Sequence, residues 1–401
     1  MAVIFRWGES KDMDRLLEAM NYAFRPEEHT GDFEKDIAPD SYFPRVMSKL
    51  YLHKDTAKYH FLTEEDGVIA GLVLLHPIPM HVAGETLRFS GVGTVSTRPG
   101  YRRKGYMVHM LETVIAEAKK RGDDLMVLGG QRQRYRHFGF DNAGAGPRFF
   151  IDKGNIRRTY DKVPEGYSFR EVKEDDTELL AGLQKLRKAA LTHSDLWDGI
   201  EYEALCTLEH WPYAVLKDGQ LAGSFLLGLP SDDSMGLPSL EDLRLFDGTK
   251  AADVIAAYIT SMDVPGVCVS NMAPEALDMQ CALSKLSDFT VLMTGEMIRI
   301  LNYRRTLSVY LKYRALIRPL ADGEACFSFD DGERLKITVK DGVPEVTEAA
   351  AEDPCISFTA DEAVRVLFSN EGHFTDEGKG LNAAAASWFP LPFYFTKSDE
   401  V

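Results

Sequence analysis

The sequence predicts a mixed α/β protein with two similar units and a third, smaller α+β unit. Two segments share the order strand, Asp-Gly turn, strand: YHFLTEEDGVIAGLVLL from Tyr59 and WPYAVLKDGQLAGSFLLGL from Trp211. Amphipathic helical patterns separate these and the other apolar runs. From about Met297, short strands around Asp-Gly turns indicate an α+β unit. We expect the three units at 1–150, 151–294 and 295–401.

Composition and charge exclude several classes of protein. The 401 residues are 45% hydrophobic and 27% charged, which is typical of a globular protein. A formal net charge of -16 argues against non-specific binding to nucleic acid or to an anionic membrane, and favours a cationic partner. The longest apolar run, VIAGLVLL at 68–75, is far shorter than the roughly 18 residues that a membrane span needs. We therefore expect no membrane span and no nucleic-acid partner.

Cysteine and histidine usage predicts neither disulfides nor a metal. The five cysteines are scattered and form no CxxC pair. The first 20 residues carry too many charges for a signal-peptide core, so we expect a cytoplasmic protein. Of the histidines in the first unit, His109 and His137 have no partner at ligand spacing. His76 and His81 lie in the same unit. We expect no metal.

The elements of the first unit follow from local patterns. AVIF at 2–5 reads as a strand, and SKDMDRLLEAMNYAF reads as a helix with Ser10 as its N-cap. The hairpin around Asp66-Gly67 comes next. ETLRFSGVGTVST is a further strand that ends before Pro99, because proline has no N–H for pairing.

The basic stretch GYRRKGY at 100–106 joins that strand to an amphipathic helix, YMVHMLETVIAEAKKR. Gly122 follows the helix as a stop signal, and DLMVLGG then reads as a short buried strand. The order is therefore strand, basic glycine loop, helix, strand.

Such a loop can bind an anion. The first amides of a helix lack intrahelical acceptors, and the helix dipole adds partial positive charge. Gly105 permits close approach of the backbone, and Arg102 and Arg103 supply charged donors. A Walker loop is excluded because Tyr106 stands where its lysine belongs, and GxGxxG is absent. A solvated turn and a nucleic-acid contact are the alternatives to a phosphate site.

The remaining elements are predicted in the same way. DKGNIRRTYDKVPEG at 152–166 reads as a polar linker, and TELLAGLQKLRKAAL and KAADVIAAYIT read as helices of the second unit. The second unit carries EDLRLFDGT where the first has its basic loop, so the anion site is not repeated. In the third unit MIRILNYRRTLSVYL and ADEAVRVLF read as helices around a meander of strands.

These motifs carry a family resemblance. VGTVSTRPGYRRKGY resembles the acetyl-CoA-binding signature of the GNAT acetyltransferases, although Met107 stands where the family's general form has Gly or Ala. YRHFGF at 135–140 resembles a motif of the Eis-like branch. The resemblance implies the GNAT acyl-CoA N-acyltransferase fold in tandem, with only the first copy catalytic. It further implies a C-terminal α+β domain similar to the sterol carrier proteins.

The resemblance also implies a cosubstrate and residues that bind it. The cosubstrate is acetyl-CoA, with no metal. Strand residues Val95 and Thr97 would pair with its pantetheine arm, and the loop would hold its pyrophosphate through Arg102, Arg103, Lys104, Gly105 and Tyr106. The acceptor would be an amine of an aminoglycoside-like or polyamine-like molecule or of a lysine, and the oligomer a hexamer.

Two catalytic groups follow from the same resemblance. Tyr135 would be the general acid, since a phenol with a pKa near 10 is protonated at neutral pH. A half-buried aromatic of the core is the plain alternative. The chain-terminal carboxylate, here on Val401, would be the base. The tail runs six residues past Phe395, so three alternatives stay open: displacement of the terminus from the site, a changed register with Val401, Glu400 or Asp399 in the role, or a disordered tail.

Two other functions compete with acetyl transfer. One is an apolar-ligand or lipid binding protein, in which AVRVLF and FPLPFYF line a cavity of the C-terminal domain and the GNAT unit is a scaffold. The other is an interaction protein that uses its acidic surface. Acetyl-CoA should raise the melting temperature only if the protein is an acetyltransferase.

Overall fold

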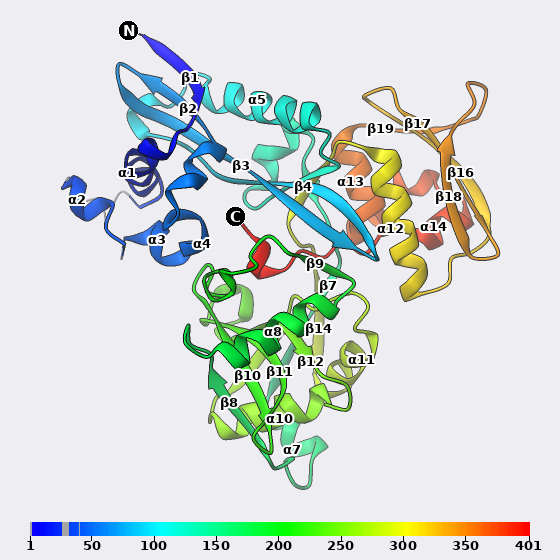
Figure 1. Ribbon diagram of the computed structural model, residues 1–401. Helices are drawn as coiled ribbons and strands as arrows, with labels where there is room; N and C mark the ends of the chain where they lie inside the picture. Colours follow the sequence, from blue (N-terminus) through cyan, green and yellow to red (C-terminus); the bar gives the residue numbers. More distant parts are fainter. Residues whose placement is uncertain (1, 26–31, 40) are drawn as a thin grey trace.

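The computed structural model describes residues 2–25, 32–39 and 41–401, and these residues form three β-sheets with helices around them (Figure 1). The mixed α/β prediction is confirmed. No described helix has the length and apolarity required to cross a membrane.

The first sheet is antiparallel except for one parallel pair of neighbouring strands. Its strands, in spatial order, are β1 (Val3–Trp7), β2 (His60–Glu65), β3 (Val68–Val82), β4 (Glu85–Thr97), β5 (Leu125–Leu128), β15 (Met297–Ile300) and β6 (Asp141–Asn142), and β9 (Thr192–Ser194) also pairs with β3. Only the β4–β5 step is parallel. The intervening helix α5 (Tyr106–Arg121) makes the crossover that a parallel step requires.

Alternation along β3 explains why helices cover both faces of this sheet. Ile69 and Leu74 pack against α1 (Met13–Phe24), whereas Ala70 and Val73 pack against α5. The predicted N-cap Ser10 is wrong: Ser10 lies inside a short 3₁₀ turn that precedes α1, and Glu9 caps that turn.

The second sheet repeats the order of the first. It runs β8 (Tyr167–Glu171), β10 (His210–Lys217), β11 (Gln220–Gly228), β12 (Ser239–Leu245), β13 (Gly266–Ser270), β7 (Gly146–Asp152) and β14 (Phe289–Met293). Again the fourth and fifth strands are parallel, and α10 (Ala251–Ser261) crosses between them. The predicted hairpin around Asp218-Gly219 is confirmed.

The two sheets exchange a strand. β7, which precedes the second unit in the chain, pairs with β13 and β14. β15, which follows that unit, returns to pair with β5 and β6 of the first sheet. The chain therefore passes from the first sheet to the second at β7 and returns to the first sheet at β15.

Two secondary-structure predictions are wrong. The segment at Met297 is a strand and not the start of a helix, because its residues fill the gap between β5 and β6; the helix begins at Tyr303 after the cap Asn302. The expected linker at 152–166 contains helix α7 (Lys153–Thr159), capped by Asp152.

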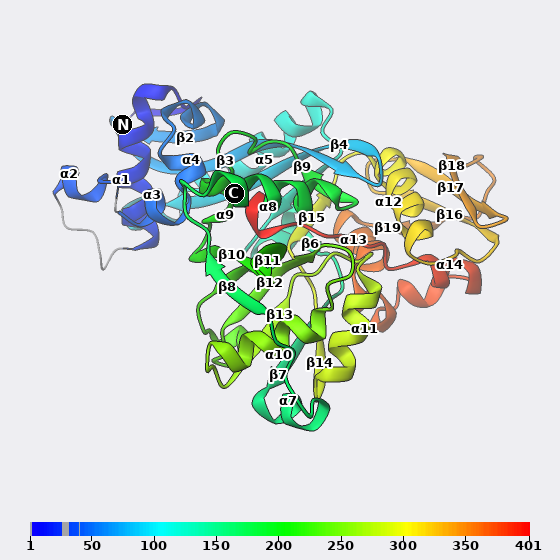
Figure 2. The ribbon, with the colours of Figure 1, turned by 60° about the horizontal axis from the view of Figure 1, so that its bottom comes forward.

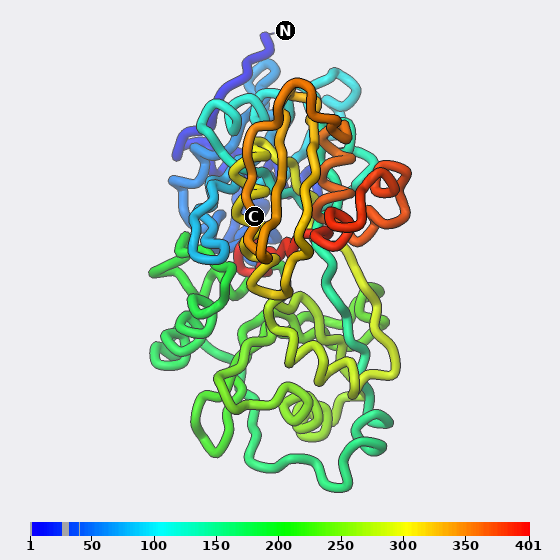
Figure 3. The backbone as a smooth tube through the Cα atoms, turned by 90° about the vertical axis from the view of Figure 1, so that its right-hand side faces the viewer, coloured from blue at the N-terminus to red at the C-terminus, as the bar shows by residue number. Residues whose placement is uncertain are grey.

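The third sheet packs against the first. Its order is β18 (Val343–Glu348), β17 (Arg334–Lys340), β16 (Gly323–Phe329) and β19 (Ile356–Phe358), with α12 (Tyr303–Ile317), α13 (Ala360–Phe368) and α14 (Ala383–Trp388). Figure 3 views the molecule from this side, with these strands in orange. One apolar core runs from Phe89 of β4 through Tyr310 of α12 to Phe327 of β16. The AVRVLF segment lies in that core.

The other described helices are short or lie on the second unit: α2 (Phe33–Asp36), α3 (Tyr42–Val46), α4 (Ser48–Tyr51), α6 (Arg132–Tyr135), α8 (Thr177–Ala189), α9 (Glu201–Leu205) and α11 (Leu277–Leu286).

Candidate active site

β4 and β5 separate at the middle of the first sheet. Their parallel pairing stops at Val92 and Leu128, where β5 ends, while β4 continues to Thr97. The register between β3 and β4 shifts at this point, and Thr94 adopts a positive φ of 46°. Beyond Val92, β4 therefore has no partner strand on the β5 side within residues 2–25, 32–39 and 41–401, and Val95 and Thr97 lie on this open edge.

The basic loop connects this open edge to the start of α5. Gly105 stands at the N-cap with φ 80°, a left-handed conformation that favours glycine, and Arg103 also has a positive φ of 66°. No side chain among the described residues caps α5, so its first amides stay available to an anion.

The charged side chains of the loop differ in availability. Lys104 Nζ contacts both carboxylate oxygens of Glu65, at 2.6 and 2.7 Å, and the Tyr106 hydroxyl donates to Glu65 at 2.6 Å. These two predicted pyrophosphate contacts therefore already have a partner on β2. Arg102 donates from Nε to the Thr97 carbonyl at 3.3 Å, and Arg103 is exposed with no ion pair to any described residue. The two guanidinium groups remain the available cations.

A cavity of about 310 Å³ lies where β4 and β5 diverge. It brings together residues that are far apart in sequence: Gly93, Val95, Leu128, Tyr135, Glu296 and Val401. Both catalytic groups expected from the sequence line this one cavity.

Tyr135 is placed by a compact turn. Tyr135 is the last residue of α6, and the YRHFGF segment continues into a 3₁₀ turn, Arg136–Phe138, that Gly139 caps with φ 75°. Asp141, fully buried, accepts hydrogen bonds from Arg132 and Arg365 and so ties this turn to α13. The side chain of Tyr135 is buried, and burial raises the pKa of its phenol against the opposing charge of Arg134. Tyr135 thus keeps its proton at neutral pH.

The C-terminal tail is folded into the molecule. Figures 1 and 2 place its end at the centre, between the first and second sheets. Residues Lys397–Asp399 form a 3₁₀ turn that takes up the residues beyond Phe395. Buried Asp399 accepts from Trp197 Nε1 at 3.1 Å and from Thr396 Oγ1 at 2.7 Å.

A lysine fixes the same turn from the first unit. The side chain of Lys49 is buried, and its Nζ donates to the Ser398 carbonyl at 2.5 Å. Burial lowers the pKa of Lys49 to about 7, while the Asp399 and Glu400 carboxylates oppose this change. The C-terminal turn is therefore fixed by Lys49 of the first unit and by Trp197 of the second unit.

The tail places the chain terminus against β4. A Cβ added to Gly93 would lie 2.7 Å from a carboxyl oxygen of Val401, and one added to Gly91 would lie 2.2 Å from Val401 Cγ2. A side chain at either position would clash with Val401, so both positions require glycine. The side chain of Val401 therefore packs beside the strand, and its carboxylate lies at the bulge.

Glu296 is a site residue that sequence reasoning missed. It precedes β15, and strand exchange carries it beside Gly129, so nothing local in the sequence indicates its place. Burial and the Glu400 carboxylate raise the pKa of Glu296 to about 7, while Lys397 opposes this shift. The cavity thus holds a carboxyl group that titrates near neutral pH.

A second, larger cavity of about 760 Å³ adjoins the first, and Leu208, Glu296, Phe395 and Glu400 line both. Its apolar wall includes Phe389, Leu391 and Phe393, which belong to the FPLPFYF segment. Its other carboxylates include Asp233 and Glu241. Acidic and apolar surface therefore continue outward from the Tyr135 cavity.

The second sheet has a corresponding bulge, and the C-terminal tail contacts it. Asp242 on β12 has φ 53°, like Thr94 on β4. The Tyr394 hydroxyl donates to Asp242 at 2.8 Å, and the Lys397 amide donates to it at 3.0 Å. The tail thus contacts the bulge of β12 through Tyr394 and Lys397, and the bulge of β4 through Val401.

Comparison with known proteins defines the class of the first unit. Residues 5–143 match the family model of the acetyltransferase (GNAT) domain. These residues form a GNAT acetyltransferase domain, and the protein is therefore an acyltransferase enzyme. No curated protein matches the sequence.

Solved structures show the fold over the whole chain. A GCN5-related N-acetyltransferase from Anabaena variabilis is 15% identical with a TM-score of 0.66, and the match covers 98% of each chain. A probable N-acyltransferase from Enterococcus faecalis, a conserved protein of unknown function, is 14% identical with a TM-score of 0.66, covering 98% of this chain and 100% of that one. Eis1 from Mycobacterium abscessus is 14% identical with a TM-score of 0.61, covering 98% and 99%.

Proposed function

We propose that the protein is an acetyl-CoA-dependent N-acetyltransferase that acts on an amine of a cationic acceptor. One observation carries the proposal: the open edge of β4 leads from a cavity lined by Tyr135 and the Val401 carboxylate to an uncapped helix with two available arginines. Amine acetylation needs an activated acetyl group, a proton acceptor and a proton donor.

The residues of the first unit fit acetyl-CoA. The edge of β4 at Val95 and Thr97, where the pairing with β5 has ended, suits the amides of the pantetheine arm, as a further strand would pair there. The Thr97 carbonyl would exchange its contact with Arg102 for one with the arm. The amides at Gly105 and Tyr106, with Arg102 and Arg103, suit the pyrophosphate. Lys104 acts indirectly, by holding Glu65 beside the loop. Acetyl-CoA supplies a thioester-activated acetyl group.

The proton transfers are assigned to three groups. The Tyr135 hydroxyl donates its proton to the departing thiolate. The Val401 carboxylate at Gly93 accepts the proton of the acceptor ammonium. Glu296, with its pKa near the operating pH, is well matched to share this role, because proton transfer is most efficient when the pKa lies near the ambient pH.

The larger cavity suits the acceptor. Glu296 and Glu400 line the passage between the two cavities, and Glu400 pairs with Lys397 at 3.1 Å. Carboxylates at this passage favour a cation there. This agrees with the net charge of -16. A polyamine-like or aminoglycoside-like acceptor, or a lysine side chain, carries the required ammonium group.

Other features are proposed on resemblance alone. They are the division into GNAT units at 1–150 and 151–294, a sterol-carrier-like unit at 295–401, a hexamer and a cytoplasmic location. The second unit is proposed to be non-catalytic, because its helix α10 follows Asp247 and Lys250 in place of two arginines.

The proposal is tested by ligand-induced stabilisation. Acetyl-CoA at about 100 times its Kd should stabilise the full chain by about 2.7 kcal/mol and raise Tm, whereas a long-chain fatty acid should leave Tm unchanged. Stabilisation by the fatty acid alone would favour the apolar-ligand function instead.

A further inference from the structure

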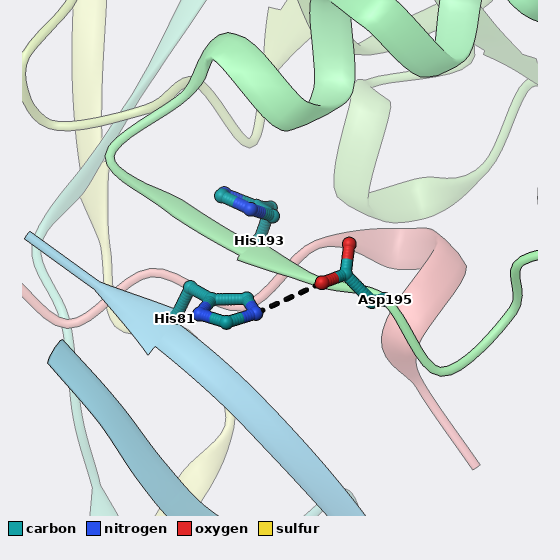
Figure 4. Close-up of side chains that lie close together, drawn as sticks. All are labelled: His81, His193 and Asp195. Carbon is teal, nitrogen blue, oxygen red and sulfur yellow. Dashed lines mark hydrogen bonds and ion pairs between the residues drawn. The ribbon is translucent and has the colours of Figure 1, made fainter. Parts of the chain in front are cut away.

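β9 joins the second unit to the first sheet and brings two histidines together. It pairs with the far end of β3, so that Met80 faces Ser194 and His81 faces His193 across the strands. The two imidazole centroids are 4.8 Å apart. Asp195 follows directly on the same strand end, and Figure 4 shows the three side chains close together, with a dashed line between His81 and Asp195.

The donor atoms of the three residues are close enough to share an ion. His81 Nε2 lies 2.9 Å from Asp195 Oδ2. One ligand atom from each of His81, His193 and Asp195 lies within 4.8 Å of the other two. The set contains two imidazoles and one carboxylate, which are donors that first-row divalent metals prefer.

Hydrogen bonds to the other ring nitrogens orient both histidines. His193 Nδ1 lies 3.0 Å from the Ala190 carbonyl, which can only accept, so this nitrogen carries the proton. The lone pair of His193 therefore sits on Nε2. His81 Nδ1 lies 3.1 Å from Thr86 Oγ1, which can accept a proton from Nδ1 when Nε2 binds an ion. Such partners are typical of metal-binding histidines.

We propose that His81, His193 and Asp195 form a binding site for a divalent transition metal such as Zn²⁺. Ligand atoms around tetrahedral zinc stand about 3.4 Å apart, given Zn–N distances of about 2.0–2.1 Å. The half-exposed side chains reach this spacing by rotation, and water completes the coordination. Lys188, which lies 3.0 Å from Asp195, keeps its other partner Asp198 at 2.6 Å when Asp195 turns to the metal.

The bound metal would fasten the second unit to the first sheet close to the tail. Trp197 stands two residues after Asp195, and its Nε1 donates to the buried Asp399. A metal that ties β9 to β3 thus supports the segment that holds the C-terminal turn. Local spacing in the sequence gives no sign of this cluster, because His81 and Asp195 are 114 positions apart.

Metal binding by the full chain tests the site. After treatment with a chelator, titration calorimetry with Zn²⁺ should give one site per chain, and bound Co²⁺ should show the visible absorption of a nitrogen-ligated ion. His81→Gln and His193→Gln should each lower the affinity at least tenfold. His373→Gln, an exposed histidine of the third unit, is the matched control and should bind normally.

A second pair of variants keeps the result decisive if a histidine variant folds poorly. Asp195→Asn should lower the affinity, whereas Asp198→Asn, which removes the other partner of Lys188, should not. Metal-free melting curves report the fold of each variant. Equal Zn²⁺ affinity in wild type, Asp195→Asn and the folded histidine variants would overturn the proposal, and binding of several ions per chain with unchanged affinity would do the same.

Discussion

The carboxyl group of Val401 lies directly against Gly93 at the bulge of β4. A Cβ on Gly93 would stand 2.9 Å from the carboxyl carbon, closer than real Cβ atoms approach other atoms. The chain end and the strand therefore fit only because residue 93 has no side chain. The proposed base thus depends on this contact.

Gly93→Ala should displace the terminal carboxylate. Because a displacement of about 1 Å can lower turnover about a hundredfold, we expect kcat to fall tenfold to a hundredfold while acetyl-CoA affinity stays near that of wild type. Steady-state kinetics and calorimetry measure the two quantities. Gly380→Ala, an exposed glycine with only ordinary contacts at 3.8 and 3.9 Å, is the control. Normal kcat in Gly93→Ala would remove the carboxylate from the mechanism.

Tyr135→Phe should lower kcat by about 10²–10⁴ while leaving acetyl-CoA binding intact, because it deletes the proton donor and keeps the ring. Pre-steady-state thiol release measures the step. Tyr258→Phe in the core of the second unit is the control. If Tyr135→Phe turns over like wild type, Tyr135 is a core residue only.

Arg102→Ala with Arg103→Ala should weaken acetyl-CoA binding by about 1–3 kcal/mol for each charged hydrogen bond lost. Calorimetry in low salt measures this loss. Lys119→Ala with Lys120→Ala removes two charges from the opposite end of α5 and should have little effect. An unchanged affinity in the arginine variant would mean that the pyrophosphate lies elsewhere.

Glu296→Gln should change stability in a pH-dependent way. The pKa of Glu296 rises from 4.5 to about 7 in the folded state, so its contribution is fully present below pH 4.5 and is lost as pH rises through 7. Glutamine resembles the neutral acid, so the variant should match wild type at pH 4.5 and exceed it at pH 8 by up to about 3 kcal/mol. Urea unfolding at both pH values measures this. Glu348 is exposed and serves as the control. An equal gain in the free energy of unfolding at pH 8 for Glu348→Gln would show that the gain does not come from the burial of Glu296.

Local patterns predicted the part of the site that is continuous in sequence. The end of β4, the loop and α5 follow one another, and their signals at Pro99, Gly105 and Gly122 are backbone requirements of single residues. The parts that could not be predicted depend on long-range pairing. Glu296 reaches the cavity through the exchange of β15, and the strand at Met297 reads as a helix until the gap beside β5 is known.

The tail illustrates the same limit. Its sequence left three alternatives open, because the buried partners of Asp399 and Ser398, namely Trp197 and Lys49, come from two other units. No property of the last six residues alone identifies these partners.

The most direct test of the account is amine-dependent release of thiol from acetyl-CoA by the purified full chain, measured with spermidine as acceptor. We expect thiol release that saturates with spermidine and a matching acetylated product in the mass spectrum. Failure of spermidine, an aminoglycoside and a lysine peptide all to accelerate thiol release, with acetyl-CoA shown to be bound, would contradict it.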